Sequence, residues 1–143
     1  MIIGSTPSPQ SASIDPAVSP SVEVVVCSLG ARDLAPMIYR QRLVIEGTSR
    51  APITAEQICS YLSELSDVCE MHLLLEPVTH RSDRYGWAGW VHWDDSGAHF
   101  YAWESPKLFF SVDIYTCKPF DANRASQFTK DFFDAPEVVA MAF

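Results

Sequence analysis

Between residues 85 and 117, apolar and polar positions alternate with a period of two, which is typical of β-strands. The alternation is strictest over Ala98–Trp103. Aromatic and β-branched residues fill the segments on either side, and clusters of Asp, Ser, Gly and Pro separate them, as in tight turns. The pattern predicts three strands and two turns, at Trp87–Trp93, Asp94–Gly97, Ala98–Trp103, Glu104–Lys107 and Leu108–Thr116.

Two segments show the spacing of amphipathic helices. Thr54 and Gln57 have the residue types of a capping box, which places a helix start at this point. The segment that follows carries apolar residues on one stripe, and a second such stripe lies within Ala122–Phe133. The residues expected to face the core are Ile58, Tyr61, Leu62 and Leu65 in the first helix and Ala125, Phe128 and Phe132 in the second.

Shorter apolar runs predict the remaining strands of the main domain. Arg40–Gly47 and Val138–Phe143 are rich in residues that favour strands. Met71–Val78 is predicted as another strand, because Pro77 and the polar segment Thr79–Arg84 would close it with a loop.

The first 37 residues differ in composition from the rest of the chain. Residues 1–20 are rich in Ser and Pro and have few large apolar groups, so we expect a disordered or loosely attached tail. Ser21–Leu29 is predicted as an added edge strand. Ala31–Tyr39 is predicted as a short helix that Pro36 interrupts. We therefore expect a partly disordered extension over residues 1–37 and one domain over residues 38–143.

The predicted order of the domain, β-α-β-β-β-β-α-β, indicates an α+β fold. Its simplest arrangement is an antiparallel-rich sheet with two helices packed on one face, a two-layer sandwich. His99, Tyr101 and Trp103 would then face away from the helices, whereas the alternate residues Ala98, Phe100 and Ala102 would face them. Because so aromatic a sheet face is rarely left in water, we expect a homodimer that buries it.

Composition excludes several classes of partner. At 143 residues the chain is long enough for one well-packed domain, and its 18 acidic and 10 basic residues give a net charge of −8. That charge argues against binding nucleic acid or an anionic membrane surface. No apolar run is long enough to span a membrane, and no signal peptide is visible. The four cysteines have no metal-binding spacing, so we expect a cytoplasmic protein with reduced thiols.

Three sequence blocks resemble one known family. Tyr85-Gly86-Trp87-Ala88-Gly89 leads without a gap into Asp94-Asp95-Ser96, and this arrangement resembles the short bacterial S-adenosylmethionine decarboxylases. Trp103 falls on the tryptophan of that family. After one extra residue, Val112–Cys117 falls on its Val-Asp-Ile-Phe-Thr-Cys, and Arg42–Glu46 resembles its first strand. The resemblance covers roughly residues 40–143.

Members of that family make a pyruvoyl cofactor by cutting their own chain before a serine. The resemblance implies that the chain is cut between Asp95 and Ser96 and that Ser96 becomes the pyruvoyl group. This group acts as an electron sink while a small amino-acid substrate loses carbon dioxide. Cys117 would be the proton donor. The implied activity is decarboxylation of S-adenosylmethionine for the biosynthesis of polyamines such as spermidine.

The resemblance also assigns substrate-binding residues and reveals departures. Trp103 matches the family directly, and Glu104 is an approximate match to the glutamate that holds the ribose hydroxyls. The family has His directly after the serine, where this chain has Gly97, and a second His where this chain has Tyr101. His99, two residues before Tyr101 on the same strand face, is the candidate to replace the missing acid–base group.

Other interpretations of the same residues remain open. Ser96 can be an ordinary hairpin residue, and Cys117 a small buried apolar group. His92 and His99 among tryptophans resemble a metal cage, but packing explains alternating aromatics better, and we expect no metal. The chain can also be a decarboxylase of another amino acid, such as ornithine or arginine. The alternative function is an uncleaved relative, either a binding or regulatory protein or a non-decarboxylating enzyme that uses S-adenosylmethionine.

Overall fold

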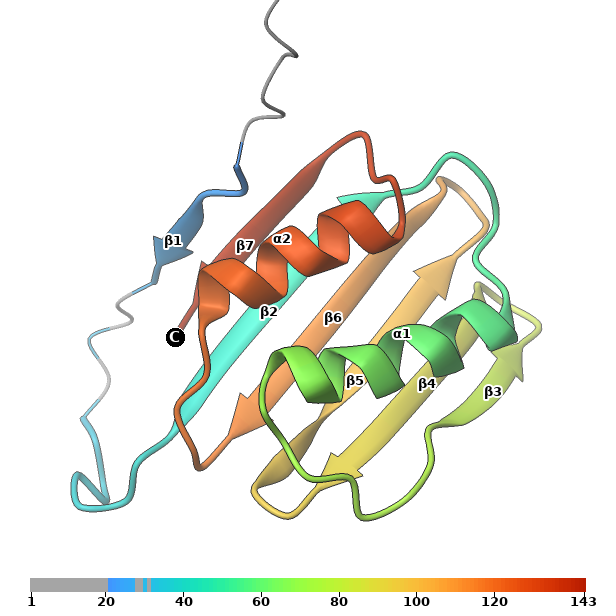
Figure 1. The fold of residues 1–143 in the computed structure, drawn as a ribbon. Helices are drawn as coiled ribbons and strands as arrows, with labels where there is room; N and C mark the ends of the chain where they lie inside the picture. The colour runs from blue at the N-terminus through green and yellow to red at the C-terminus, as the bar shows by residue number, and fades with distance from the viewer. Residues whose placement is uncertain (1–20, 28–29, 31) are drawn as a thin grey trace, which may run out of the picture.

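The computed structural model describes residues 21–27, 30 and 32–143, and over these residues it contains two helices and one sheet (Figure 1). The elements are β1 (Val24–Val26), β2 (Gln41–Thr48), α1 (Ala55–Val68), β3 (Val78–Ser82), β4 (Gly86–Trp93), β5 (Ser96–Trp103), β6 (Phe109–Thr116), α2 (Ala122–Phe132) and β7 (Val138–Ala142).

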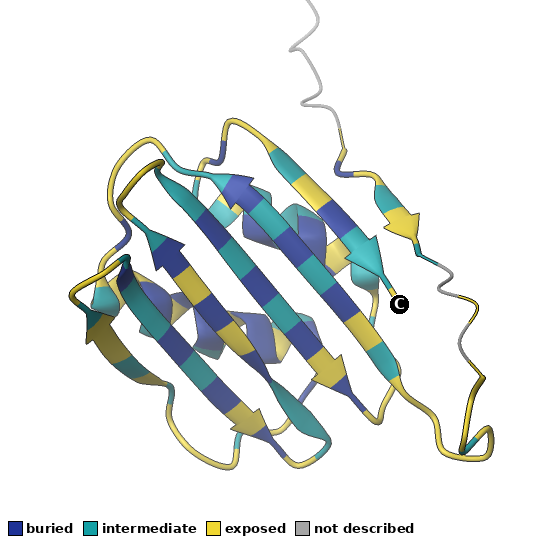
Figure 2. Cartoon of the chain, turned by 180° about the vertical axis from the view of Figure 1, so that it is seen from behind, coloured by how far each residue is buried: buried dark blue, intermediate teal, exposed yellow. Residues whose placement is uncertain are grey.

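The seven strands form one sheet in the order β1-β7-β2-β6-β5-β4-β3. Neighbours pair antiparallel except β1, which runs parallel to β7. Both helices lie on the same face of the sheet (Figure 1). From behind, no helix covers the strands, and burial alternates along them (Figure 2). The predicted α+β fold with two helices on one face is confirmed, and we call the uncovered side the open face.

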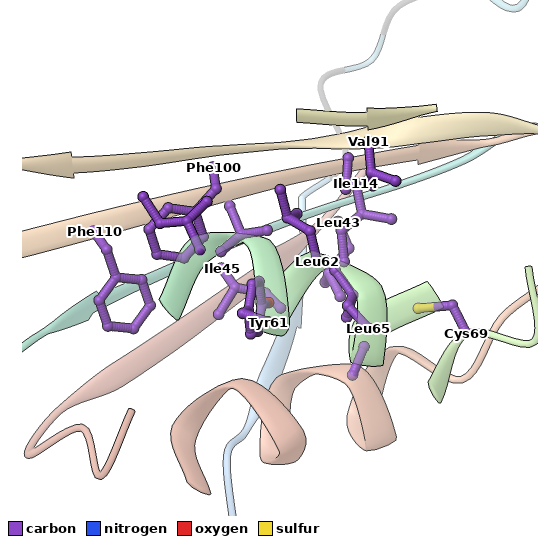
Figure 3. Packing of buried hydrophobic residues seen from close by; sticks show 14 of the residues in the cluster. Leu43, Ile45, Tyr61, Leu62, Leu65, Cys69, Val91, Phe100, Phe110 and Ile114 are labelled. Carbon is purple, nitrogen blue, oxygen red and sulfur yellow. The ribbon is translucent and has the colours of Figure 1, made fainter. Parts of the chain in front are cut away.

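The core lies between the helices and the inward residues of the sheet (Figure 3). Tyr61 of α1 is completely buried at its centre and packs against four phenylalanine rings. Its hydroxyl lies 2.7 Å from Oγ1 of Thr129 on α2. Burial raises the pKa of Tyr61 far above its usual range, so the hydroxyl stays neutral. The four rings belong to Phe100, Phe128, Phe132 and Phe133.

Local capping explains where the helices begin. The Thr54 side chain accepts a hydrogen bond from the Gln57 main chain, and the Gln57 side chain accepts one from the Thr54 main chain. This confirms the predicted capping box. Asp121 caps α2 by accepting from the N–H groups of Asn123 and Arg124.

The predicted strand Met71–Val78 is wrong in position. The strand β3 begins at Val78 and takes up most of the segment Thr79–Arg84, which was predicted as a loop. Within the predicted strand, Leu73 makes only an isolated bridge to Trp93. An edge strand has one neighbour and exposes much of its surface. The residues of β3 are therefore mostly polar and lack the alternation of apolar and polar positions that predicts a strand.

The predicted helix at Ala31–Tyr39 is also wrong over its described part, residues 32–39, which form a turn at residues 36–37 within otherwise irregular chain. Asp33 accepts a hydrogen bond from the N–H of Ala35, and Ile38 donates to the Ala35 carbonyl. A short side chain that bonds its own backbone favours such a turn over a helix.

The predicted N-terminal edge strand exists as the three residues of β1. Three parts of these predictions lie outside the described residues: the tail at residues 1–20, the end of the N-terminal strand at residues 28–29, and the first residue of the predicted helix, Ala31.

A buried hydrogen bond between α1 and β4 gives a test of this packing. The Trp93 Nε1–H group donates to Ser66 Oγ at 2.7 Å, and both side chains are buried. We expect Ser66→Ala to lower the free energy of unfolding by about 1–3 kcal/mol, because it leaves a buried donor without its acceptor. Urea unfolding followed by Trp fluorescence measures the change. Ser63→Ala, at a half-exposed site of the same helix, is the matched control and should change little.

Candidate functional site

The β4–β5 hairpin places Ser96 in a strained position. The turn consists of Asp94 and Asp95 alone, and β5 begins at Ser96, so the turn is shorter than the predicted Asp94–Gly97. Ser96 pairs with Trp93 on β4 and with Thr116 on β6. Its φ is 135°, a region that residues other than glycine rarely adopt. Such a conformation costs on the order of 1–3 kcal/mol and is commonly found at functional sites.

Cys117 approaches Ser96 from the end of β6. The Ser96 Oγ and Cys117 Sγ atoms are 3.6 Å apart, and Cys117 is exposed. The main-chain N–H of Cys117 donates to the carbonyl oxygen of Asp95 at 2.9 Å. The serine hydroxyl, the thiol and the peptide carbonyl before the serine are therefore gathered at one end of the sheet.

These groups lie at the end of an open pocket of about 680 Å³, formed largely by side chains of the open face. Strand register brings its central row together: His92, Gly97, Tyr115 and Arg42 are successive neighbours across β4, β5, β6 and β2. His99 pairs with Asp113 in the next row. The full lining is Arg42, Val91, His92, Trp93, Asp94, Asp95, Ser96, Gly97, Ala98, His99, Asp113, Tyr115 and Cys117.

Gly97 is required by the close approach of β4. A Cβ atom at this position would lie 2.4 Å from the carbonyl oxygen of Val91, a distance that backbone atoms do not tolerate. The absence of a side chain also leaves a gap between His92 and Tyr115 in the central row. The sequence alone identified Gly97 as a departure from the resembled family, and the structure gives a packing reason for it.

An ion pair forms one wall of the pocket. The Arg42 guanidinium donates to both carboxylate oxygens of Asp113, at 2.9 and 2.6 Å. The guanidinium carbon of Arg42, Cζ, lies 5.8 Å from the centre of the Phe143 ring. The hydrogen bonds to Asp113 raise the pKa of Arg42, which therefore stays charged. The pocket thus contains a fixed positive group next to an acidic one.

Not every predicted site residue lies in this pocket. Ser96, Cys117, Asp95 and His99 line it together. Tyr101 follows His99 on the same face, with ring centroids 6.5 Å apart, but is not among the lining residues.

The predicted substrate-binding residues lie at the other end of β5. Trp103 packs against Tyr101, Phe109 and Tyr85. Glu104 pairs with Arg81 at 3.1 Å. At roughly 3.3 Å per residue, Trp103 lies about 23 Å along the strand from Ser96.

Strand pairing brings into the pocket four residues that the sequence did not assign to the site: Arg42, His92, Asp113 and Tyr115. Each lies in a predicted strand, where side chains alternate between the two faces of the sheet, so the sequence could assign it to one of these faces. Only the pairing of strands distant in sequence shows that these positions meet.

The four cysteines differ in environment. Burial raises the pKa of the Cys69 thiol to about 12, and this side chain is only 2% exposed. Cys27 and Cys59 are half-buried, and Cys117 is the exposed one. Of the four, Cys117 alone lines the pocket.

Over the described part of the chain, the structure shows neither a metal-binding cluster nor a membrane-spanning helix. There, no three or more His, Cys, Asp or Glu side chains are grouped so that they could hold a metal ion. Neither of the two helices has the length and apolar character needed to cross a bilayer.

Comparison with known proteins gives one family and one fold. The family model described as S-adenosylmethionine decarboxylase matches residues 47–143. The crystal structure of the adenosylmethionine decarboxylase from Aquifex aeolicus is similar, with a TM-score of 0.61 and 15% sequence identity. The match covers 74% of this chain and 89% of that one. No curated protein matches the sequence.

Proposed function

The chain belongs to the S-adenosylmethionine decarboxylase family, and on this premise we propose that it is a pyruvoyl-dependent decarboxylase that cuts itself between Asp95 and Ser96. The observation that carries the proposal is the left-handed conformation of Ser96, whose hydroxyl lies 3.6 Å from the Cys117 thiol in an open pocket. The proposed substrate is S-adenosylmethionine, and the product would serve the biosynthesis of polyamines such as spermidine.

The first step is an attack of Ser96 Oγ on the carbonyl carbon of Asp95. The new C–O bond and the broken C–N bond convert the peptide into an ester. A base then removes the Cα proton of residue 96 as the Cβ–Oγ bond breaks, which releases the Asp95 carboxylate and leaves a Cα=Cβ double bond. Water removes the nitrogen as ammonia and leaves a ketone at the new N-terminus. Strain at Ser96 favours these steps, because cutting the chain relieves it.

The residues around Ser96 fit the group that would form there. When formed, the pyruvoyl ketone supplies an electron sink for the electrons released with carbon dioxide. Cys117 is positioned to deliver a proton to the substrate carbon, since its exposed thiol lies beside Ser96 in the pocket. Arg42 and Asp113 offer a cation and an anion for the polar ends of an amino-acid substrate.

We assign the acid–base role in self-cleavage to His99. Two positions that are His in the family are Gly97 and Tyr101 here, and the packing of Gly97 against Val91 leaves no room for a side chain. His99 lines the pocket, and Asp113 is the residue opposite it in the register of β5 and β6. His92 lines the same pocket from β4 and is the alternative.

The positions of Trp103 and Glu104 support a homodimer. Both lie at the far end of β5, about 23 Å from Ser96 at 3.3 Å per residue. Two copies can pair through their open faces about a twofold axis near the middle of β5. In that arrangement the Trp103–Glu104 end of one copy would cover the Ser96 end of the other. Tyr101, 37% exposed, and Tyr115, 44% exposed, would be buried in that interface.

A second candidate function is an uncut relative that binds S-adenosylmethionine without decarboxylating it or acts as a binding or regulatory protein. The replacement of two family histidines by Gly97 and Tyr101 favours it. In this case Ser96 would be a strained turn residue only. The cleavage assay below separates the two functions.

Cleavage is tested by the intact mass of purified protein under denaturing conditions. We expect two fragments that meet between Asp95 and Ser96, the second beginning with a pyruvoyl group. Ser96→Ala should stay uncut, because it has no attacking hydroxyl. The cut protein should release carbon dioxide from S-adenosylmethionine, and release from ornithine or arginine instead would reassign the substrate. A wild-type chain that stays whole for days would refute the decarboxylase and leave the second function.

The role of His99 is tested by the rate of self-cleavage. We expect His99→Ala to slow cleavage by about 10²- to 10⁴-fold, the usual effect of losing a general acid or base. His92→Ala should have a smaller effect. His80→Ala is the control, because His80 is exposed on β3 and does not line the pocket. A large effect of His92→Ala alone would transfer the role to that residue.

The dimer is tested by a charge placed at the middle of the open face. Ser111 pairs with Tyr101 on β5 and with Glu46 on β2 and lies outside the pocket. We expect the wild type to sediment as a dimer and Ser111→Arg as a monomer, because the new charge would be desolvated in the interface. Ser60→Arg, on the exposed side of α1, should remain dimeric. A wild-type monomer at high concentration would contradict the assembly.

A further inference from the structure

We propose that Gln41 is a positioning residue for proton delivery, one that holds the Cys117 thiol beside Ser96. This inference rests on the proposed function and gives a role to a side chain outside the pocket. Gln41 is the first residue of β2, and its partner in the register of β2 and β6 is Thr116, the residue before Cys117. Gln41 therefore lies next to the start of the loop that leads from β6 to α2 (Figure 1).

The Gln41 side chain fastens the other end of this loop. Its Nε2 group donates to the main-chain carbonyl of Phe120 at 3.0 Å, and its Oε1 atom accepts from the main-chain N–H of Phe120 at 3.1 Å. Turned over, the amide would place its oxygen against the Phe120 carbonyl and its NH2 group against the N–H, so both bonds would be lost. The Tyr39 hydroxyl also donates to Oε1, at 2.9 Å. The amide is thus held in one orientation.

The main chain and the side chain of Gln41 together act as a staple across Cys117. Strand pairing of the main chain holds Thr116, directly before the cysteine, and the side chain holds Phe120, three residues after it. Phe120 is half-buried and packs against the core, so its main-chain groups depend on protein partners. Loss of the Gln41 amide would take away both of these partners and release the loop at Phe120.

The Cys117 thiol depends on this staple because its own surroundings constrain it weakly. The side chain is exposed, so packing does not fix it. The Thr116 hydroxyl donates to the Lys118 carbonyl at 2.6 Å, which spans the cysteine, and the Lys118 ammonium donates to the main-chain carbonyl of Glu70 at 2.7 Å. The main chain on either side of the thiol therefore sets its position, and the bonds from Gln41 complete that restraint.

Proton delivery requires the thiol in one place. After carbon dioxide leaves, the substrate carbon takes the proton of the Cys117 thiol: the S–H bond breaks, a C–H bond forms, and the thiolate then regains a proton from water. A donor must lie within hydrogen-bond reach of the reacting atom, and a displacement of about 1 Å can cost on the order of 10²-fold in rate. A loop released at Phe120 would let the thiol move among several positions, so proton transfer would slow while substrate binding stayed the same.

Gln41→Met tests this role, because methionine has nearly the same length and removes the hydrogen bonds to Phe120. We expect kcat for carbon dioxide release to fall about tenfold with KM nearly unchanged. Self-cleavage should keep roughly the wild-type rate, since Ser96 keeps its strand neighbours. Gln127→Met makes the same exchange on α2, where the side chain bonds other parts of the chain, and this matched control should leave kcat unchanged.

A second variant separates positioning from a general effect on the fold. Cys117→Ala removes the group that Gln41 would position, and single-turnover release of labelled carbon dioxide measures its residual rate over hours. In that background we expect Gln41→Met to have no further effect, because a residue that acts through the thiol has nothing left to position. Two effects that multiply would show that Gln41 acts on the fold or on substrate binding, and the positioning role would be wrong.

Hydrogen exchange tests the staple without relying on turnover. Chains that carry Ser96→Ala stay whole, and their exchange can be followed by mass spectrometry of peptic peptides. We expect Gln41→Met to speed exchange of the main-chain amides in residues 118–121 by about tenfold or more, because the loop opens locally. Amides of β5 and α1 should exchange as they do with Gln41 intact, and Gln127→Met should not change the loop.

The outcomes separate this inference from the proposed function. Unchanged exchange in the loop would mean that Gln41 does not hold it, and the inference would be wrong. Faster exchange with an unchanged kcat would also overturn the inference, while the decarboxylase would stand. Faster exchange with a lower kcat, and no further loss in the Cys117→Ala chain, would support it. A wild-type chain that is never cut would remove the proposed function and the positioning role together.

Discussion

The packing of both helices against a single face of the sheet is the constraint on which the rest of the structure depends. Tyr61 sits at its centre, enclosed by a ring from the sheet and by rings from the C-terminal half of α2, with its hydroxyl satisfied by Thr129. Because this core takes up every second side chain of the strands, the remaining side chains must face away from the helices. One-sided packing thus creates the open face on which the pocket lies.

On the open face, strand register determines which side chains become neighbours. The row from His92 through Gly97 and Tyr115 to Arg42 joins four strands that lie far apart in the sequence, between Gln41 and Thr116. A shift of one residue in any of these strands would turn its polar residues into the core, at a large cost in buried polar groups. The same hydrophobic burial that stabilises the fold therefore fixes the geometry of the site.

Beside that row, the hairpin concentrates strain and hydrogen bonding on one peptide bond. Ser96 adopts a left-handed φ, and the carbonyl before it is held by the last rung of the β5–β6 ladder. Gly97 permits this arrangement, because β4 passes too close for a side chain. Ser96 and Cys117, which the resemblance assigns to the site, thus lie together at this end of the sheet, whereas Gly97 and Tyr101 stand where the family pattern has histidine.

The sequence by itself determined the class of fold, both helices and the strands of the sheet centre, because period-two and helical patterns and capping residues act over a few neighbouring positions. Ser96 and Cys117 were predicted as site residues from the family resemblance, and the fold brings their side chains to within 3.6 Å of each other. It misplaced β3, whose edge position leaves no buried stripe, and the turn within residues 32–39, where Asp33 bonds its own backbone. Only the tertiary structure decided that Arg42, His92 and Asp113 line one pocket while Trp103 and Glu104 lie at the other end of β5. The physical reason is that pairing between strands distant in the chain depends on the whole core, which no local pattern encodes.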